Sequence, residues 1–209
     1  GGFKMKNNRQ KVTLTLTIIY LVSILILYFF GGIYKALQII ALILAVIFII
    51  LLIITLLYIS KTNKEDNLEI SKLMDNGKID ECIDFLNQRI EKYFFSILIA
   101  SQRINLISAY LMKNRVDEAR ELVYDYSYFG LNKCVSYYKI IFELYDGNTN
   151  AAKKLYNKFL KLSNTLYDIQ KDNAKRLIEL VETREFDFDL YNNTAYPIVK
   201  KICQMYTSK

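Results

Sequence analysis

The chain has 209 residues and a mass of 24.5 kDa, enough for one ordinary domain or two small ones. Hydrophobic residues make up 53% of it and charged residues 23%, but the two kinds are segregated, because residues 12–59 contain a single charge, Lys35. The absence of His excludes Ser-His-Asp and Cys-His nucleophile arrangements, His-ligated metal sites and a His general base. One Pro and seven Gly are too few for a β-sandwich or barrel, so an all-α protein is expected.

The net charge of +7 comes mainly from the N-terminal end, where residues 1–11 carry four basic side chains and no acid. Residues 61–209 hold 23 basic and 21 acidic side chains, a near balance that predicts no nucleic-acid partner. Met5, at the head of the basic run, would be a natural start, so Gly1 and Gly2 are set aside. The abundance of Ile, Lys, Asn and Tyr suggests a low-GC bacterium.

Two uncharged stretches follow, residues 12–30 and 36–59. At about 1.5 Å per residue they reach roughly 28 and 36 Å, so both can cross a bilayer core. Residues 31–35 between them include two glycines for a tight reversal. We therefore expect a basic N-terminus at 1–11, a transmembrane helical hairpin at 12–59, a linker at 60–66 and a helical domain at 67–209.

The charges flanking the spans predict how the hairpin sits in the membrane. Basic residues precede the first span and resume at Lys61 and Lys64, so the positive-inside rule places both termini in the cytoplasm. No charged side chain lies deep in either span, which favours an anchor over a transport path. The outer aromatic belt would be formed by Tyr28, Phe29, Phe30 and Tyr34, with Tyr58 at the inner interface.

Beyond the membrane, apolar residues recur at helical spacing in runs separated by three short polar breaks, at 75–78, 113–115 and 146–148. Aligned on these breaks, each run places a small residue five positions after the turn. These residues are Cys82, Ala119 and Ala152, at spacings of 37 and 33. Residues 66–163 therefore resemble the tetratricopeptide repeat, a family of stacked antiparallel helix pairs with a period of about 34 residues.

The resemblance implies packing roles for Cys82, Ala119 and Ala152 and turn roles for Gly77 and Gly147. Tyr110 matches the large aromatic of the first helix. The chain departs from the family where Asn114 replaces the turn glycine, where the first-helix Trp and the closing Pro are missing, and where Phe94 and Phe95 lie in an insertion. A generic α-solenoid or an irregular helical domain is the alternative.

The resemblance also implies a concave groove that would hold a peptide from a protein partner. The groove positions fall on Asn67, Ser71, Ile104, Ser108, Met112, Tyr137, Ile141 and Tyr145. Ile104, Ile141 and Tyr137 have a second interpretation as core residues. No ladder of Lys and Arg accompanies these positions, so no particular peptide carboxylate is indicated.

The C-terminal part continues as an amphipathic helix after Ser163 and a final capping helix near 197–206, for which Thr194 is the expected N-cap. Six aromatic residues between 124 and 138 suit either an interface or the space between helices. They are Tyr124, Tyr126, Tyr128, Phe129, Tyr137 and Tyr138.

No catalytic residue, metal site or cofactor is predicted. Cys82, Cys134 and Cys203 lack metal-ligand or disulfide spacing and are interpreted as buried apolar residues in a reducing cytoplasm. The acidic residues Glu182, Glu185, Asp187 and Asp189 alternate with Phe186 and Phe188, which favours a solvated loop held by two aromatics over a cation site or paired-carboxylate chemistry.

The sequence therefore favours a non-enzymatic scaffold or adaptor that recruits a partner, expected to be part of a membrane complex, to the cytoplasmic membrane face. The lipid bilayer is its first expected partner, and whether the hairpin forms a homo-oligomer is left open. The alternative is a small immunity or exporter-accessory protein that acts through the hairpin itself. An enzyme that uses carboxylates or tyrosine alone, with Glu182 and Asp187, is the weakest hypothesis.

Overall fold

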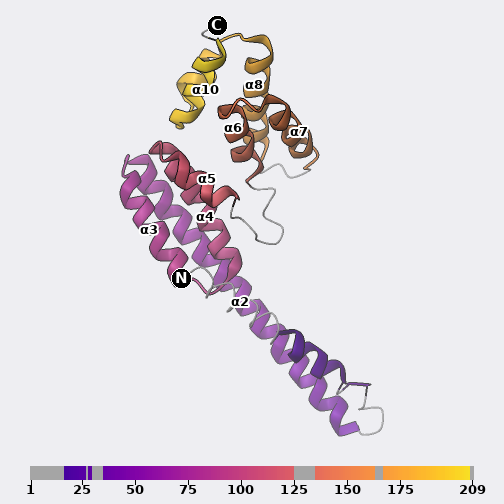
Figure 1. Cartoon of the computed structure of the whole chain (residues 1–209). Helices are drawn as coiled ribbons and strands as arrows, with labels where there is room; N and C mark the ends of the chain where they lie inside the picture. Colours follow the sequence, from indigo (N-terminus) through magenta and orange to yellow (C-terminus); the bar gives the residue numbers. More distant parts are fainter. Residues whose placement is uncertain (1–16, 27, 30–34, 125–134, 163–166, 208–209) are drawn as a thin grey trace. The chain divides into compact units, whose positions relative to one another are not determined.

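The computed structural model describes residues 17–26, 28–29, 35–124, 135–162 and 167–207. Regular structure in these ranges is helical, with no strand among them, so the predicted all-α class is confirmed. From residue 35 onward the helices are α2 (Lys35–Asp75), α3 (Ile79–Lys92), α4 (Ser96–Met112), α5 (Val116–Tyr124), α6 (Ser136–Tyr145), α7 (Thr149–Leu160), α8 (Asp168–Thr183), α9 (Phe188–Asn193) and α10 (Pro197–Thr207) (Figure 1).

The described residues form two compact units. The first contains the residues up to Ser71 together with the segment Tyr93–Leu98. The second contains Lys72–Lys92 and the described residues from Ile99 onward, and it holds the large hydrophobic core.

In the first unit, the helix at Thr17–Ile26 packs along one face of α2 (Figure 1). The Tyr20 hydroxyl donates to the carbonyl oxygen of Leu44 at 3.2 Å, and the Tyr20 ring lies 5.6 Å from that of Phe48. Ala41, Leu44 and Phe48 recur at spacings of three and four residues, so they share a face. The small side chain of Ala41, only 2% exposed, permits a close approach of the two helices.

The residues expected to form a linker, 60–66, are instead helical and continue α2, which runs for 41 residues. The stretch is polar but contains no Gly or Pro, so nothing in it breaks a helix. Lys61 and Glu65 form an ion pair one turn apart at 3.9 Å. The change in polarity at residue 60 therefore marks where the apolar part of α2 ends, while the helix itself continues.

The turns α2–α3, α4–α5 and α6–α7 have the same backbone geometry. Each has one left-handed residue, with φ of 71° at Gly77, 57° at Asn114 and 81° at Gly147. The next N–H bonds the carbonyl five residues earlier, at 2.9, 2.8 and 2.7 Å respectively, which closes a Schellman motif. Asn tolerates the left-handed region better than other non-glycine residues, which explains how Asn114 serves in place of glycine.

The small residue after each turn is fully buried. Cys82, Ala119 and Ala152 are each 0% exposed, and each donates its N–H to the carbonyl four residues earlier, at 3.0, 3.2 and 3.0 Å. Because no surface of these side chains reaches solvent, a larger side chain would have to displace its neighbours.

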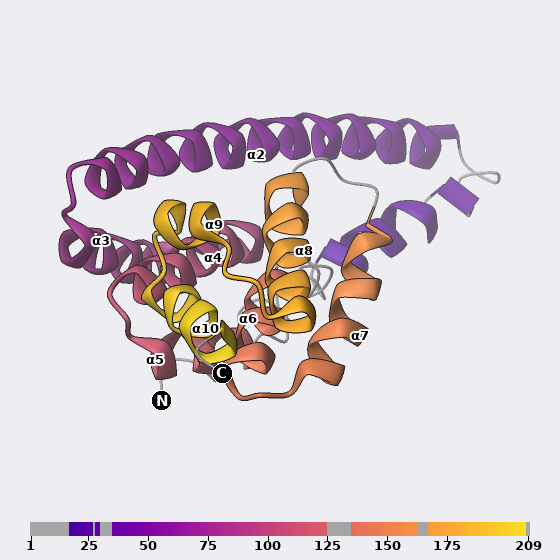
Figure 2. The same ribbon diagram turned by 90° about the horizontal axis from the view of Figure 1, so that it is seen from above.

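The core of the second unit is centred on α6. This helix packs against α7, α8 and α10, and both views place α10 and α7 on opposite sides of α6 and α8 (Figures 1 and 2). Its apolar side chains Ile140, Ile141, Phe142 and Leu144 are 0% exposed. A helix that is apolar on nearly every side must be covered on nearly every side. On α10, the residues with no exposure are Ile198, Val199, Ile202 and Cys203.

The C-terminal helices begin near the expected positions but with different caps. α8 begins at Asp168, while Ser163 and Leu166 lie outside the described residues. The prediction of Thr194 as N-cap of the last helix is wrong, because α10 begins three residues later, at Pro197. Thr194 is instead the C-cap of α9, and its hydroxyl accepts the N–H of Tyr196 at 3.2 Å. Proline suits the first helical position, where its missing N–H has no intrahelical role.

Candidate functional site

The eight residues predicted to line a groove lie on three helices. Asn67 and Ser71 are exposed on α2, in the first unit. The other six belong to the second unit: Ile104, Ser108 and Met112 lie on α4, and Tyr137, Ile141 and Tyr145 lie on α6.

Most of these six positions are occupied by the protein's own packing. Tyr137 is 5% exposed and Ile141 is 0% exposed, so both belong to the core and a partner cannot reach them in this structure. Ile104 is half-buried against the same core. The Ser108 hydroxyl lies 2.6 Å from the Tyr196 hydroxyl, next to the start of α10. The physical reason is that the last helix, expected to cap the end of the array, packs on α6 instead.

A cluster of tyrosines joins α4, α6, α8 and the start of α10. The Tyr137 and Tyr138 rings lie 5.8 Å apart, and Tyr138 lies 6.5 Å from Tyr196. The Tyr138 hydroxyl lies near Ser108 and Tyr196, which hydrogen-bond each other, and the Tyr137 hydroxyl lies near Asn173 on α8. Burial raises the pKa of both Tyr137 and Tyr138, so their phenols are neutral at physiological pH. They are suited to structural hydrogen bonding, because a catalytic base would need a lowered pKa.

Tyr145 is the predicted groove residue that borders an open depression. We call this depression, of about 510 Å³, the Tyr145 pocket; its lining residues are Tyr145, Lys201, Gln204 and Met205. The Lys201 ammonium lies 5.8 Å from the centre of the Tyr145 ring, and Lys201, Gln204 and Met205 are exposed. An aromatic ring, a thioether, an amide and a cation can together bind a peptide side chain through apolar and polar contacts.

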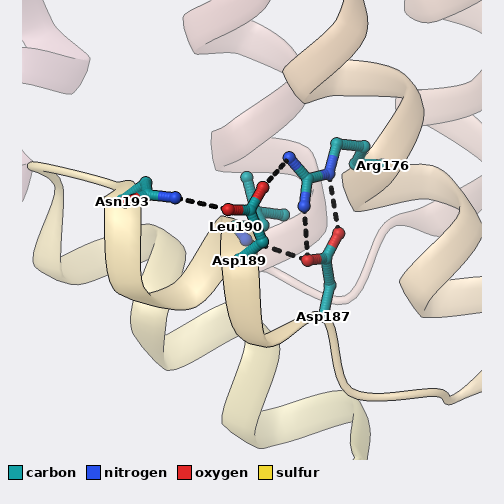
Figure 3. Close-up of polar contacts among 5 residues, drawn as sticks. All are labelled: Arg176, Asp187, Asp189, Leu190 and Asn193. Carbon is teal, nitrogen blue, oxygen red and sulfur yellow. Dashed lines mark hydrogen bonds and ion pairs between the residues drawn. The ribbon is translucent and has the colours of Figure 1, made fainter.

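The acidic residues near 187 form part of an ion-pair cluster with Arg176 on α8 (Figure 3). The Arg176 guanidinium donates to both carboxylate oxygens of Asp187, at 2.7 and 2.5 Å, and lies 2.7 Å from Asp189. The Asp187 carboxylate also accepts the N–H of Leu190 at 2.8 Å and so caps α9. The hydrogen bonds from Arg176 hold the pKa of Asp187 below its usual value.

This cluster connects α8 to α9 and engages Asp187, one of the two carboxylates that the enzyme hypothesis would need. Glu182 pairs separately with Lys153 on α7, at 2.7 Å, so Glu182 and Asp187 serve different cations. Phe186 lies 4.7 Å from Phe188 and 5.2 Å from Tyr191 and is partly buried against the core, whereas Phe188 is 71% exposed and the segment from Phe188 to Asn193 forms the short helix α9. Among the described residues, no group of His, Cys, Asp and Glu is suited to hold a metal ion.

The described cysteines are buried, free thiols. Burial raises the pKa of Cys82, and it raises the pKa of Cys203 to about 11. A thiol with a raised pKa is a poor nucleophile at neutral pH. Cys134 and the aromatic residues Tyr126, Tyr128 and Phe129 lie outside the described residues.

Within the described part of the chain, one helix is long and apolar enough to cross a membrane: the stretch Ile39–Asp75 of α2. Only 6% of its apolar window is buried, which distinguishes it from the core helix of a soluble domain. Tyr58 and the described belt residues Tyr28 and Phe29 are exposed, whereas Phe30 and Tyr34 lie outside the described residues.

Two residues that form polar contacts in the second unit, Tyr196 and Arg176, were not predicted from the sequence. Tyr196 is 88 positions from Ser108, and no local pattern connects them. The ion pair of Arg176 with Asp187 could be predicted only if α9 were recognised first. The signal for that helix was Asp187 itself, since an aspartate is a favoured N-cap residue.

No family model, curated protein or solved structure matches the chain.

Proposed function

We propose that this chain is a membrane-anchored adaptor, held in the cell membrane by a two-helix hairpin and binding a protein partner through its helical domain at the cytoplasmic face. The observation that carries the anchor is the exposed apolar surface of α2, whose window is only 6% buried. Exposing such a surface to water costs roughly 25 cal/mol per Å² of apolar area, and a bilayer removes that cost.

The packing of Tyr20 on Leu44 and Phe48 supports a second span that pairs with α2. The basic residues before the first span, and Lys61 and Lys64 after the second, support cytoplasmic termini. Side chains on the remaining faces of the two helices, such as Ile19 and Ile50, are exposed, as lipid-facing residues of a hairpin would be.

The three matching turns at Gly77, Asn114 and Gly147 support an array of antiparallel helix pairs like that of the tetratricopeptide repeat. In this proposal the partner binds at the Tyr145 pocket, because Tyr137 and Ile141 are core. The expected partner is a protein or peptide that belongs to a membrane complex.

The test is photo-crosslinking of the full chain in cells, with a photoreactive residue at Gln204 or Met205 of the Tyr145 pocket. Ile169 on α8 is the matched control, since it is 77% exposed and lies outside the pocket. We expect one protein to crosslink from both pocket positions, to fail to crosslink from Ile169, and to be lost when Lys201→Glu reverses the pocket's charge. Equal crosslinking from Ile169, or none from the pocket, would contradict the proposal.

A further inference from the structure

The short segment Tyr93–Leu98, between α3 and α4, belongs to the same compact unit as the apolar part of α2. Contacts of Tyr93 and Phe95 help to hold it there. The Tyr93 hydroxyl donates to the buried carboxylate of Asp66, and the Phe95 ring lies 6.2 Å from that of Tyr58. Tyr93 is 8% exposed and Asp66 1% exposed, so the first contact is a buried one.

Next to these buried anchors, the segment exposes apolar side chains. Phe94 is 52% exposed and stacks edge-on against Phe95 at 5.8 Å, and Ile97 is 57% exposed. Aromatic and large aliphatic side chains are seldom left together at the surface of a soluble domain without a partner. In the sequence, Phe94 and Phe95 lie in the insertion that lengthens the first interval of the repeat.

The position of Tyr58 indicates what covers this surface. Tyr58 lies at the end of the uncharged stretch of α2, where an amphipathic ring meets the boundary between acyl chains and headgroups. Phe95 contacts Tyr58, and the exposed Phe94 ring lies 5.8 Å from Phe95, so the exposed apolar side chains of this segment lie near that boundary. Lys64 follows within two turns and is exposed, and its ammonium group suits contact with anionic headgroups.

We infer that Phe94 and Ile97 insert into the headgroup region of the membrane and give the chain a second lipid contact beside its span. The inference rests on the proposed anchoring through α2. Apolar side chains that lie in the interface and partition into its acyl boundary add to the membrane affinity supplied by the span. The hydrogen bond from Tyr93 to Asp66 also fixes which face of the polar half of α2 lies next to the segment.

The chain contains no Trp, so a single introduced Trp is its only indole fluorophore. The full chain would be reconstituted in vesicles of zwitterionic and anionic phospholipid, with bromine at shallow or deep acyl positions. Phe94→Trp and Ile97→Trp probe the segment. Phe188→Trp is the matched control, because Phe188 is 71% exposed on α9 of the second unit, and Ile50→Trp reports insertion of the span.

We expect Phe94→Trp and Ile97→Trp to emit at shorter wavelength than Phe188→Trp and to lose most of their emission to shallow bromines and less to deep ones. Phe188→Trp should keep its emission with either lipid. If Ile50→Trp is quenched while both segment probes behave like Phe188→Trp, the second contact is refuted and the anchor stands. If Ile50→Trp also keeps its emission, both the anchor and this inference fail.

Discussion

The Ser108 hydroxyl on α4 lies 2.6 Å from the Tyr196 hydroxyl, although 88 positions separate the two residues. Tyr196 immediately precedes α10, so this contact fixes the start of the last helix against α4. It places a residue predicted to line a ligand groove in a contact within the domain. The Tyr145 pocket, where we propose that a partner binds, is lined by residues at the other end of α10.

Removing the Tyr196 hydroxyl should destabilise the second unit. Tyr196→Phe loses its hydrogen bond with Ser108, and such a bond contributes about 1 kcal/mol to the free energy of unfolding. Urea unfolding of the detergent-solubilised chain, followed by circular dichroism, measures the loss. Tyr191→Phe is the control, because the Tyr191 hydroxyl makes only an exposed contact with Gln204 at 3.2 Å. Equal losses for the two variants would show that the contact between Tyr196 and Ser108 adds no more stability than the exposed contact of Tyr191.

Truncating the buried face of α10 should be far more costly than truncating its exposed face. Ile202 is 0% exposed, so Ile202→Ala leaves a cavity and should lower the free energy of unfolding by about 2–5 kcal/mol. Met205, 44% exposed at the Tyr145 pocket, should tolerate Met205→Ala with little change. Thermal unfolding of both variants decides whether α10 is a core helix. If Ile202→Ala unfolds like the wild type, α10 is a detachable segment and the groove beneath it is available.

The left-handed turn residues should differ in what they tolerate. Nothing lies within 4 Å of a Cβ atom added at Gly147, so Gly147→Ala costs only backbone strain, roughly 1–2 kcal/mol. Asn114→Gly relieves the same strain and should leave stability unchanged or slightly raised, whereas Asn114→Ala should lower it. The three melting temperatures test this order, and a lower value for Asn114→Gly than for Asn114→Ala would contradict the shared turn geometry.

The ion pair between Arg176 and Asp187 should make stability fall at acidic pH. Arg176 holds the folded-state pKa of Asp187 below its usual value of 3.8, so the stabilisation is complete above that value and is lost as the pH falls through the lower folded pKa. Asp187→Asn removes the charge but retains a residue able to cap α9. The stability difference between wild type and Asp187→Asn should therefore be constant from neutral pH to about pH 4 and shrink below it. A difference that does not change with pH would show that the charge pair contributes nothing.

Local features of the chain could be predicted from the sequence because local physics determines them. Gly77 and Gly147 indicate where helices end. The small residues Cys82, Ala119 and Ala152 each lie five positions after a turn, and each is buried next to it. At 60–66 the polarity of the sequence predicts a linker, but the stretch contains no helix breaker, so α2 continues through it.

The candidate site was harder to predict because it depends on contacts between distant segments. Whether Tyr137 and Ile141 face a groove or a core depends on how α7, α8 and α10 pack around α6, and neither residue carries a signal of that packing. Tyr145 stays next to an open pocket because it lies at the end of α6, beside Lys201 and Met205. Sequence periodicity indicates that a residue is on an apolar face, but the covering element is set by the tertiary fold.

The most direct test of an adaptor is the location of its partner. The protein that crosslinks from Met205 would be tagged and followed by fractionation of cells that carry the wild-type chain, the Lys201→Glu variant, or no chain. An adaptor that recruits through the Tyr145 pocket predicts a membrane-bound partner with the wild type and a partner released to the cytosol with Lys201→Glu, while the variant itself stays in the membrane. A partner that remains at the membrane in all three strains would contradict recruitment by this chain.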